Sequence, residues 1–320
     1  MKYRCAILDD YQNVALSYAD WSSLAPEVDI KIFNQPFKST EDVHRSLQGF
    51  QIICMMRERT AFLRNTLEAL PDLKLLITTG AGNKSIDLDA AAARGITVAG
   101  TGTFGSPTTG VTFGLILELT RRIGFENTRM KAGAPWQVTV GQDIEGLTLG
   151  VIGLGKLGRR VVNVAKAFGM KVIAWSQNLT TERAAEVGAT LVSKDKLFQE
   201  ADVVTIHLVL SGRTRGLVGA AELALMKPTA RLVNTSRGPI VVEADLVEAL
   251  KAKTIAGAAI DVFDQEPLPL DHPFRALPNL LATPHIGYVS RGLYARFYQD
   301  TVANICRWLD GQAAARHLEN

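Results

Sequence analysis

Short runs of consecutive apolar residues recur along the chain, and stretches with apolar residues at helical spacing separate them. In the first third these runs lie at 5–8, 52–55, 75–77 and 96–98. In the rest they lie at 149–152, 172–175, 203–206, 231–233, 256–260 and 280–282, roughly 20 to 30 residues apart, which is typical of strand, crossover helix and parallel strand. Because the runs are continuous rather than alternating, we expect both faces of the strands to be covered. The pattern predicts an α/β fold with open parallel sheets.

Two helical stretches indicate where the chain passes between domains. A Gly/Thr/Pro-rich segment at 99–107 precedes an apolar helical stretch from Thr108 to about Arg122, which we expect to end at Gly124. A second helix is expected from about Arg291 to Leu309. The C-terminal helix would then return to the first domain. We therefore expect a discontinuous domain of residues 1–103 and 289–320, and a second domain of residues 104–288.

Length and composition exclude several classes of protein. A chain of 320 residues is long enough for two domains of about 150 residues each, and 47% hydrophobic with 21% charged residues is ordinary globular composition. The formal net charge of +3 is spread without a basic block, which argues against a nucleic-acid surface. The longest uncharged stretch, residues 95–117, is too polar for a membrane helix.

The N-terminus and the cysteines indicate the compartment. The first ten residues contain no apolar core long enough for a secretory signal. The three cysteines, Cys5, Cys54 and Cys306, are not at metal-ligand spacing, so no metal site is expected. Cys5 and Cys54 lie in strand-like runs, where a thiol is usually a small buried hydrophobe. We expect a cytoplasmic protein with reduced thiols.

The sharpest local motif is a glycine-rich turn between a strand and a helix. The sequence VIGLGKLG at 151–158 follows an apolar strand, and a helical apolar pattern continues from it to Gly169. In such a turn Gly153 allows the tight bend, Gly155 lets the backbone approach a pyrophosphate, and Gly158 packs the helix on the sheet. The helix N-terminus adds free N–H groups and a positive dipole end. The motif predicts a dinucleotide site.

The end of the next strand leaves the choice of dinucleotide open. An acidic residue usually follows that strand and holds the ribose 2′-hydroxyl of NAD. Here the strand ends in Trp175-Ser176-Gln177-Asn178, with neither that acid nor an adjacent Lys or Arg for a 2′-phosphate. NAD is favoured, and NADP remains open.

Three later segments bring polar residues to strand ends, which is the edge where open sheets bind ligands. They contain Arg237, Glu266 and His285. An arginine can hold a carboxylate through two hydrogen bonds, and a histidine beside a carboxylate can exchange a proton near neutrality. Singly, the three could be a surface charge, a solvated acid and a packed core histidine. Together, and after a nucleotide motif, they are the groups needed to interconvert a 2-hydroxy acid and a 2-oxo acid.

Longer segments resemble a known family. The stretches GLTLGVIGLGKLGRRVVNVAKAFGMKVIAW, LVNTSRGPIVVEADLVEAL, IAGAAIDVFDQEPLPLDHPF and LPNLLATPHIG are similar, in order, to signatures of the D-isomer-specific 2-hydroxyacid dehydrogenases. That resemblance implies a Rossmann nucleotide-binding domain and a discontinuous, flavodoxin-like substrate domain, both doubly wound. It also implies hydride transfer at C2 of the substrate, and a homodimer built on the nucleotide domain. No nucleic-acid or membrane partner is expected.

The resemblance also implies residue roles. Arg237 matches the arginine that holds the substrate carboxylate, His285 the acid/base, and Glu266 its partner carboxylate. In the first domain, Ala81 and Gly82 match backbone groups that hold the carboxylate, and Arg57 lies in a segment similar to the loop at the far end of the substrate. The residues that match cofactor-binding positions are Gly153, Gly155, Lys156, Leu157, Gly158, Ser176, His207, Thr214, Thr235, Ser236, Asp261 and Gly287.

The chain departs from the family pattern at three places. The usual Val-Ala-Glu at the start of the interdomain helix reads Thr108-Thr109-Gly110, the usual His-x-Pro reads His207-Leu208-Val209, and a glycine after His-Ile-Gly is replaced by Tyr288. A binding protein on the same fold, similar to dehydrogenase-like corepressors that sense NADH, is the alternative function. Formate dehydrogenase is disfavoured, because that branch has Gln where Glu266 stands. The identity of the 2-hydroxy acid stays open.

Overall fold

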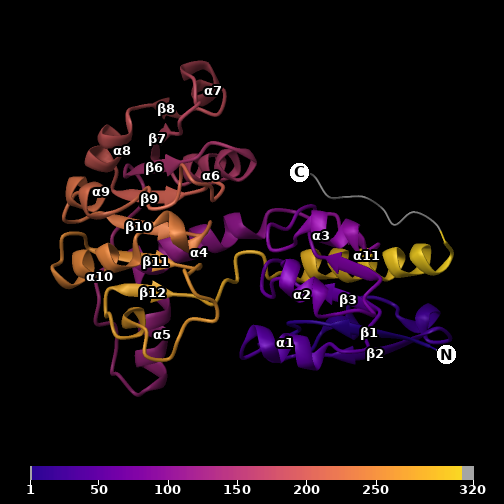
Figure 1. The fold of residues 1–320 in the computed structure, drawn as a ribbon. Coiled ribbons are helices and arrows are strands. Elements are labelled where there is room, and N and C mark those ends of the chain that lie inside the picture. The colour runs from indigo at the N-terminus through magenta and orange to yellow at the C-terminus, as the bar shows by residue number, and fades with distance from the viewer. Residues whose placement is uncertain (1, 312–320) are drawn as a thin grey trace. The chain divides into compact units, whose positions relative to one another are not determined.

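The computed structural model describes residues 2–311, which form two compact units. The first unit comprises the chain up to Gly105 and from Ser290 on, and the second comprises Ser106–Val289. The C-terminal helix therefore belongs to the same unit as the N-terminal strands (Figure 1). The expected discontinuous fold is confirmed.

The first unit is a five-stranded parallel sheet in the order β2-β1-β3-β4-β5, the flavodoxin-like arrangement. Its strands are β1 Tyr3–Ile7, β2 Val28–Ile32, β3 Ile52–Met55, β4 Leu75–Thr78 and β5 Thr97–Gly100, and its helices are α1 Thr40–Ser46, α2 Arg64–Glu68, α3 Leu88–Ala93 and α11 Arg291–Leu309. Two short 3-10 turns lie at Ala15–Ser17 and Ser22–Leu24. Side chains of α1, α2 and α3 share one core with alternate residues of β1, β3 and β4, while α11 contacts β4. Cys5 and Cys54, which were expected to be buried in strands of this sheet, are both buried.

The second unit is a seven-stranded parallel sheet in the order β12-β11-β10-β9-β6-β7-β8 (Figure 1). Counted within the unit, this is the doubly wound dinucleotide-binding order with one further strand at its edge. The strands are β6 Thr148–Ile152, β7 Lys171–Trp175, β8 Thr190–Leu191, β9 Val203–Ile206, β10 Arg231–Asn234, β11 Gly257–Ile260 and β12 Leu280–Ala282. The helices are α4 Pro107–Arg121, α5 Ile123–Lys131, α6 Lys156–Ala167, α7 Thr181–Ala185, α8 Lys194–Glu200, α9 Ala220–Leu225 and α10 Glu243–Lys251, with 3-10 turns at Gly238–Ile240 and Pro273–Arg275.

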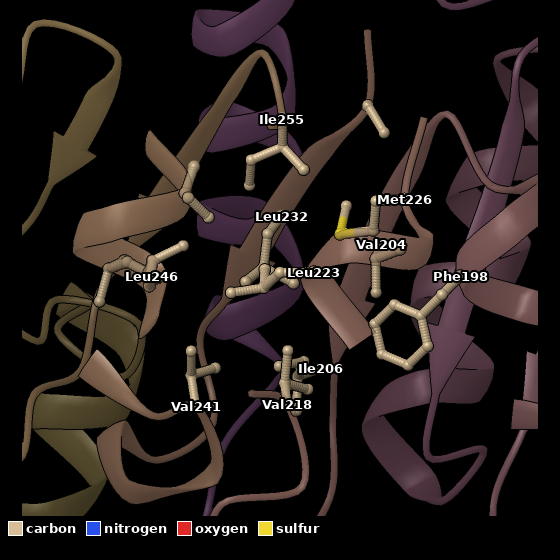
Figure 2. Packing of buried hydrophobic residues seen from close by; sticks show 14 of the residues in the cluster. Phe198, Val204, Ile206, Val218, Leu223, Met226, Leu232, Val241, Leu246 and Ile255 are labelled. Carbon is tan, nitrogen blue, oxygen red and sulfur yellow. The ribbon is translucent and has the colours of Figure 1, made fainter. Parts of the chain in front are cut away.

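Both faces of this second sheet are covered, as the continuous apolar runs predict. Successive residues of β9 enter different cores: Val203 packs with residues of α4 and α6, and Val204 packs with residues of α8, α9 and α10. Figure 2 shows the second of these cores, with Phe198 and Leu223 near Val204. The carboxyl ends of the strands are thereby held on a rigid frame.

The helix expected to end at Gly124 ends earlier. Helix α4 ends at Arg121, Arg122 takes a left-handed conformation with φ 54°, and α5 begins at Ile123, so Gly124 lies inside the next helix. The Glu118 carboxylate at the end of α4 accepts a hydrogen bond from the Gly124 amide at 2.7 Å. This side chain caps the new helix, and the break therefore needs no glycine.

Candidate active site

The glycine-rich turn joins β6 to α6 in the second unit. Gly153 has a φ of +98°, which favours glycine, and a β-carbon there would lie 2.7 Å from the His207 carbonyl oxygen. A β-carbon on Gly158 would lie 2.1 Å from the Gly153 carbonyl oxygen. At Gly155, by contrast, no described atom lies within 4 Å of the β-carbon position. The turn is therefore tight on its inner side and open at Gly155, an arrangement that fits a pyrophosphate on the N-terminus of α6.

His207 lies next to this turn. Its amide donates to the Ile152 carbonyl at 2.7 Å, and its ring Nε2 lies 3.0 Å from the Thr205 hydroxyl. The other ring nitrogen, Nδ1, is buried and has no hydrogen-bond partner among residues 2–311. Burial lowers the pKa of His207 to about 4, so the ring is neutral near pH 7. A buried polar atom with no partner in the protein fits a site completed by a ligand.

The other expected cofactor positions lie on loops and at the start of α6 in the same unit. Ser176 directly follows β7, and Lys156 and Leu157 begin α6. The hydroxyl of Thr214 donates to the Val209 carbonyl at 2.8 Å and so closes its loop. The Thr235 hydroxyl pairs with that of Thr112 at 3.0 Å, and the Ser236 hydroxyl donates to the Leu208 carbonyl.

Arg237 follows β10, which ends at Asn234, and an asparagine fixes its main chain. The Asn234 side-chain amide donates to the Arg237 carbonyl at 2.9 Å, and its oxygen accepts from the Ser236 amide at 3.0 Å. The guanidinium of Arg237 donates to the Ser236 carbonyl at 2.8 Å. Asn234 is buried, and its role could not be inferred from a motif, because an asparagine at a strand end is also a common loop residue.

His285 and Glu266 form a close pair. The His285 Nδ1 lies 2.6 Å from Glu266 Oε2, and the side chains are 25% and 31% exposed. The Phe263 amide donates to the other carboxylate oxygen at 2.9 Å. Burial by itself raises the pKa of Glu266, but the hydrogen bond and charge of His285, with lesser help from Phe263 and Arg237, hold that pKa below its ordinary value. Glu266 is therefore ionised near neutrality, and its bond to Nδ1 leaves Nε2 for proton exchange with a substrate.

Asp261 holds the loop that carries His285. The resemblance places this residue on the nicotinamide side, and in the structure its carboxylate is fully buried. It accepts hydrogen bonds from the Thr283 hydroxyl at 2.6 Å and from the amides of Ile286 and Gly287 at 2.8 and 2.7 Å. Burial raises the pKa of Asp261, and these three donors oppose that rise. They fix a loop in which His285 has a left-handed φ of 51°.

The expected substrate residues of the first unit also lie together. Arg57 has a φ of 55°, and its guanidinium donates to the Thr79 carbonyl at 3.0 Å. A β-carbon on Gly80 would lie 1.8 Å from Arg57 Nη1, so the guanidinium lies against the turn that continues into Ala81 and Gly82. Sequence reasoning assigned Arg57 to the far end of a substrate and did not foresee this contact.

Residues 2–311 contain no helix that is both long and apolar enough to span a membrane. They also contain no group of three or more His, Cys, Asp or Glu side chains arranged to hold a metal ion.

The chain is similar in sequence to known proteins. Residues 113–287, more than half of the chain, match the family model described as D-isomer specific 2-hydroxyacid dehydrogenase, NAD binding domain. A glyoxylate reductase of Aeropyrum pernix is 36% identical over 77% of this chain and 76% of its own length. A D-3-phosphoglycerate dehydrogenase of Synechocystis is 39% identical over 73% of this chain, but this match covers 42% of that longer protein.

A solved structure is similar over nearly the whole chain. The phosphoglycerate oxidoreductase of Vibrio cholerae O395 is 33% identical, with a TM-score of 0.91 over 97% of this chain and 99% of that one. The predicted resemblance is thereby confirmed by sequence and by fold. The protein belongs to the D-isomer-specific 2-hydroxyacid dehydrogenases, a family of oxidoreductases, and its second unit contains that family's NAD-binding domain.

Proposed function

We propose that this protein interconverts a D-2-hydroxy acid and its 2-oxo acid with a nicotinamide dinucleotide. The observation that carries the proposal is the 2.6 Å contact between His285 Nδ1 and an ionised Glu266. A histidine fixed in this way presents Nε2 as the acid or base of the reaction. In reduction His285 gives its proton to the carbonyl oxygen, and in oxidation it removes the proton of the hydroxyl group.

Arg237 is the residue for the substrate carboxylate in this proposal. A guanidinium forms two parallel hydrogen bonds to a carboxylate, which fixes both the position and the orientation of the acid. The main-chain hydrogen bond from Asn234 keeps the base of this side chain in place. The amides of Ala81 and Gly82 and the Arg57 guanidinium are further groups proposed to bind a substrate.

The dinucleotide would be held by the turn at Gly153, Gly155 and Gly158 and by the N-terminus of α6. When bound, its nicotinamide supplies or accepts the hydride. The protein orients the substrate and moves the proton. Ser176 provides neither an acid for the 2′-hydroxyl nor a base for a 2′-phosphate, so the preference between NAD and NADP requires measurement, with NAD favoured.

The direct test is initial-rate kinetics with NADH and with NADPH on a panel of 2-oxo acids. The panel contains glyoxylate, hydroxypyruvate, pyruvate, a branched 2-oxo acid and phosphohydroxypyruvate. Turnover of at least one of these acids is expected, and it would also establish the preferred cofactor. Tight NADH binding without turnover of any of them would contradict the proposal and favour an NADH-sensing protein.

The proposal includes a homodimer formed through the second unit. Helix α5 has no buried residue, and apolar side chains are exposed along and after it, at Ile123, Phe125, Met130, Trp136, Val138 and Val140. The same region carries both Arg129 and Glu126, so a two-fold-related copy would meet charges of both signs. Light scattering is expected to give a mass near 69 kDa, twice the 34.7 kDa of one chain, and a monomer would contradict this part of the proposal.

A further inference from the structure

A second histidine–carboxylate pair contacts the loop that carries Glu266. His272 Nε2 lies 3.2 Å from Glu243 Oε2, and both side chains are only 18% exposed. Glu243 is the first residue of α10, and His272 directly precedes the 3-10 turn at Pro273–Arg275. The proposed reaction assigns no role to this pair.

Glu243 contacts the loop through a main-chain hydrogen bond. Its Oε1 accepts from the Asp264 amide at 2.9 Å. The preceding amide, that of Phe263, donates to Glu266 Oε1 at 2.9 Å. Two successive amides of one loop are thus held by two carboxylates. Glu266 belongs to the proposed catalytic pair, and Glu243 belongs to the second pair.

The ring of His272 is fixed in one tautomer. Its Nδ1 accepts a hydrogen bond from the Phe274 amide at 3.2 Å, so the proton of the neutral ring is on Nε2 and points to Glu243. The ring also lies edge-on to that of Phe274, with centroids 4.7 Å apart. Phe274 is buried, and its ring centroid lies 6.3 Å from that of Phe263. The loop is therefore held by side-chain packing at Phe263 as well as by hydrogen bonds.

A carboxylate at Glu243 suits both of its contacts, with the Asp264 amide and with the His272 ring. A carboxylate accepts from Asp264 and from His272 at once, whereas an amide at this position would turn a donor toward one of them. The carboxylate also acts on its neighbour: burial, and after it the charge of Glu243, raise the pKa of Asp264, while Arg215 and His272 oppose that rise. Glu266 itself faces His285 and Arg237.

We propose that Glu243 and His272 are positioning residues that hold the 263–266 loop and thereby keep the Glu266 carboxylate on His285. This inference rests on the proposed function, since it assumes that Glu266 and His285 form the acid/base pair. Loss of either residue lets the loop move, and the Glu266–His285 contact lengthens. The protonated form of His285 is then less stabilised, although no group that would touch a substrate has been changed.

The test compares Glu243→Gln and His272→Asn with the matched control Glu248→Gln. Glu248 lies on the same helix, is 73% exposed and pairs only with Lys251 among the described contacts. Asparagine at 272 can still accept from the Phe274 amide, as an N-cap does, but it is too short to reach Glu243. This variant therefore keeps the turn and removes the contact with the carboxylate.

Two readouts separate a positioning role from a merely structural one. The first is the pH profile of kcat and of KM for reduction, with NADH affinity measured alongside as a check on the fold. The second is the proton NMR spectrum of the His285 ring at one pH without substrate. Both variants are expected to lose about tenfold in kcat with NADH affinity unchanged, to shift the basic limb of the profile to lower pH, and to move the His285 ring resonances.

The outcomes separate this inference from the proposed function. If the parent protein turns over a 2-oxo acid and both variants match the Glu248→Gln control in pH profile and in the His285 ring resonances, the positioning role is overturned. If the parent turns over no 2-oxo acid, the proposed function fails, and the NMR spectra still decide whether Glu243 and His272 act on His285. Loss of NADH binding together with kcat in both variants would indicate a structural role only and would also overturn the inference.

Discussion

Gly238 lies against the main chain of Phe263, so that a β-carbon on residue 238 would be 2.1 Å from the Phe263 carbonyl carbon. Gly238 directly follows Arg237, and Phe263 belongs to the loop of Glu266. The loop that carries the proposed carboxylate-binding residue is therefore in direct contact with the loop of the proposed acid/base pair. This contact requires a residue without a side chain at position 238.

We predict that Gly238→Ala separates these two loops. The added methyl group has no space, because it meets backbone rather than a flexible side chain, and such overpacking costs about 1–3 kcal/mol of unfolding free energy. Chemical denaturation and kcat measure the two effects. Gly212→Ala is the matched control, since no described atom lies within 4 Å of its β-carbon position. Equal stability and activity in the two variants would contradict the packing argument.

We predict that Glu266→Gln changes the pH profile. The amide keeps the shape but loses the charge that stabilises the protonated imidazole of His285. Reduction requires the proton on His285, so the basic limb of the pH–rate profile for reduction should move to lower pH. The kcat should also fall by about tenfold to a hundredfold. The exposed variant Glu248→Gln should leave the profile unchanged. An unmoved limb in Glu266→Gln would exclude a coupled pair.

Glu266 also links stability to pH. Its pKa in the folded chain is lowered, so its ionised form stabilises the fold at pH values above the ordinary glutamate pKa of about 4.3. This contribution is lost as the pH falls through the lowered folded value. Glu266→Gln lacks the contribution, and its unfolding free energy should therefore depend less on pH in this acidic window than that of the parent.

We predict that Arg237→Lys lowers kcat/KM for the 2-oxo acid by about tenfold to a hundredfold, because a lysine cannot form two parallel hydrogen bonds to the carboxylate. NADH affinity, measured by fluorescence, should stay at the parent value. Arg45→Ala, which removes an arginine with a 76% exposed side chain, serves as the control. Unchanged kcat/KM would remove Arg237 from the substrate site.

The sequence predicts the buried strands of both sheets but not two edge strands. Every continuous apolar run is a strand, whereas β2 alternates between apolar and charged residues and β8 has only two residues. Both lie at the edge of a sheet, where one neighbour is missing and burial is incomplete. Continuous apolarity is the signature of strands covered on both faces, so it cannot detect strands of this kind.

The residues of the candidate site likewise divide into those that the sequence predicts and those that it does not. Arg237, Glu266 and His285 could be found because their chemistry is distinctive and they follow strands. The residues that hold them could not: Asn234 ends β10, Glu243 begins α10 and His272 lies in a loop, and each residue type is ordinary at such a place. Their roles depend on main-chain hydrogen bonds, which no residue pattern specifies.

We predict that His207 titrates with a midpoint at about pH 4, measured by NMR of its ring protons. In the unfolded chain it titrates near pH 6.5, so between these values the unfolded state binds a proton that the folded state does not. Stability should therefore fall as the pH is lowered from about 6.5 to 4. His207→Gln should weaken that dependence. A midpoint near 6.5 in the folded protein would mean that the ring is solvated.

The last prediction separates the roles of two glycines in the nucleotide turn. Gly155→Ala adds a methyl group to open space, so thermal unfolding should not change. The same methyl group lies where a pyrophosphate would approach the amides of α6, and loss of one or two charge-assisted hydrogen bonds weakens NADH binding by about tenfold to a hundredfold. Gly158→Ala is expected to lose both stability and NADH binding, because its β-carbon would lie 2.1 Å from the Gly153 carbonyl oxygen.

Differential scanning calorimetry and NADH fluorescence titration on these two variants measure the effects independently. If Gly155→Ala keeps the stability of the parent but binds NADH more weakly, glycine is needed at position 155 for ligand binding. At position 158 glycine is then needed for the fold. If Gly155→Ala bound NADH as tightly as the parent, the pyrophosphate could not lie over this turn. The open space at Gly155 would then be a property of the loop alone.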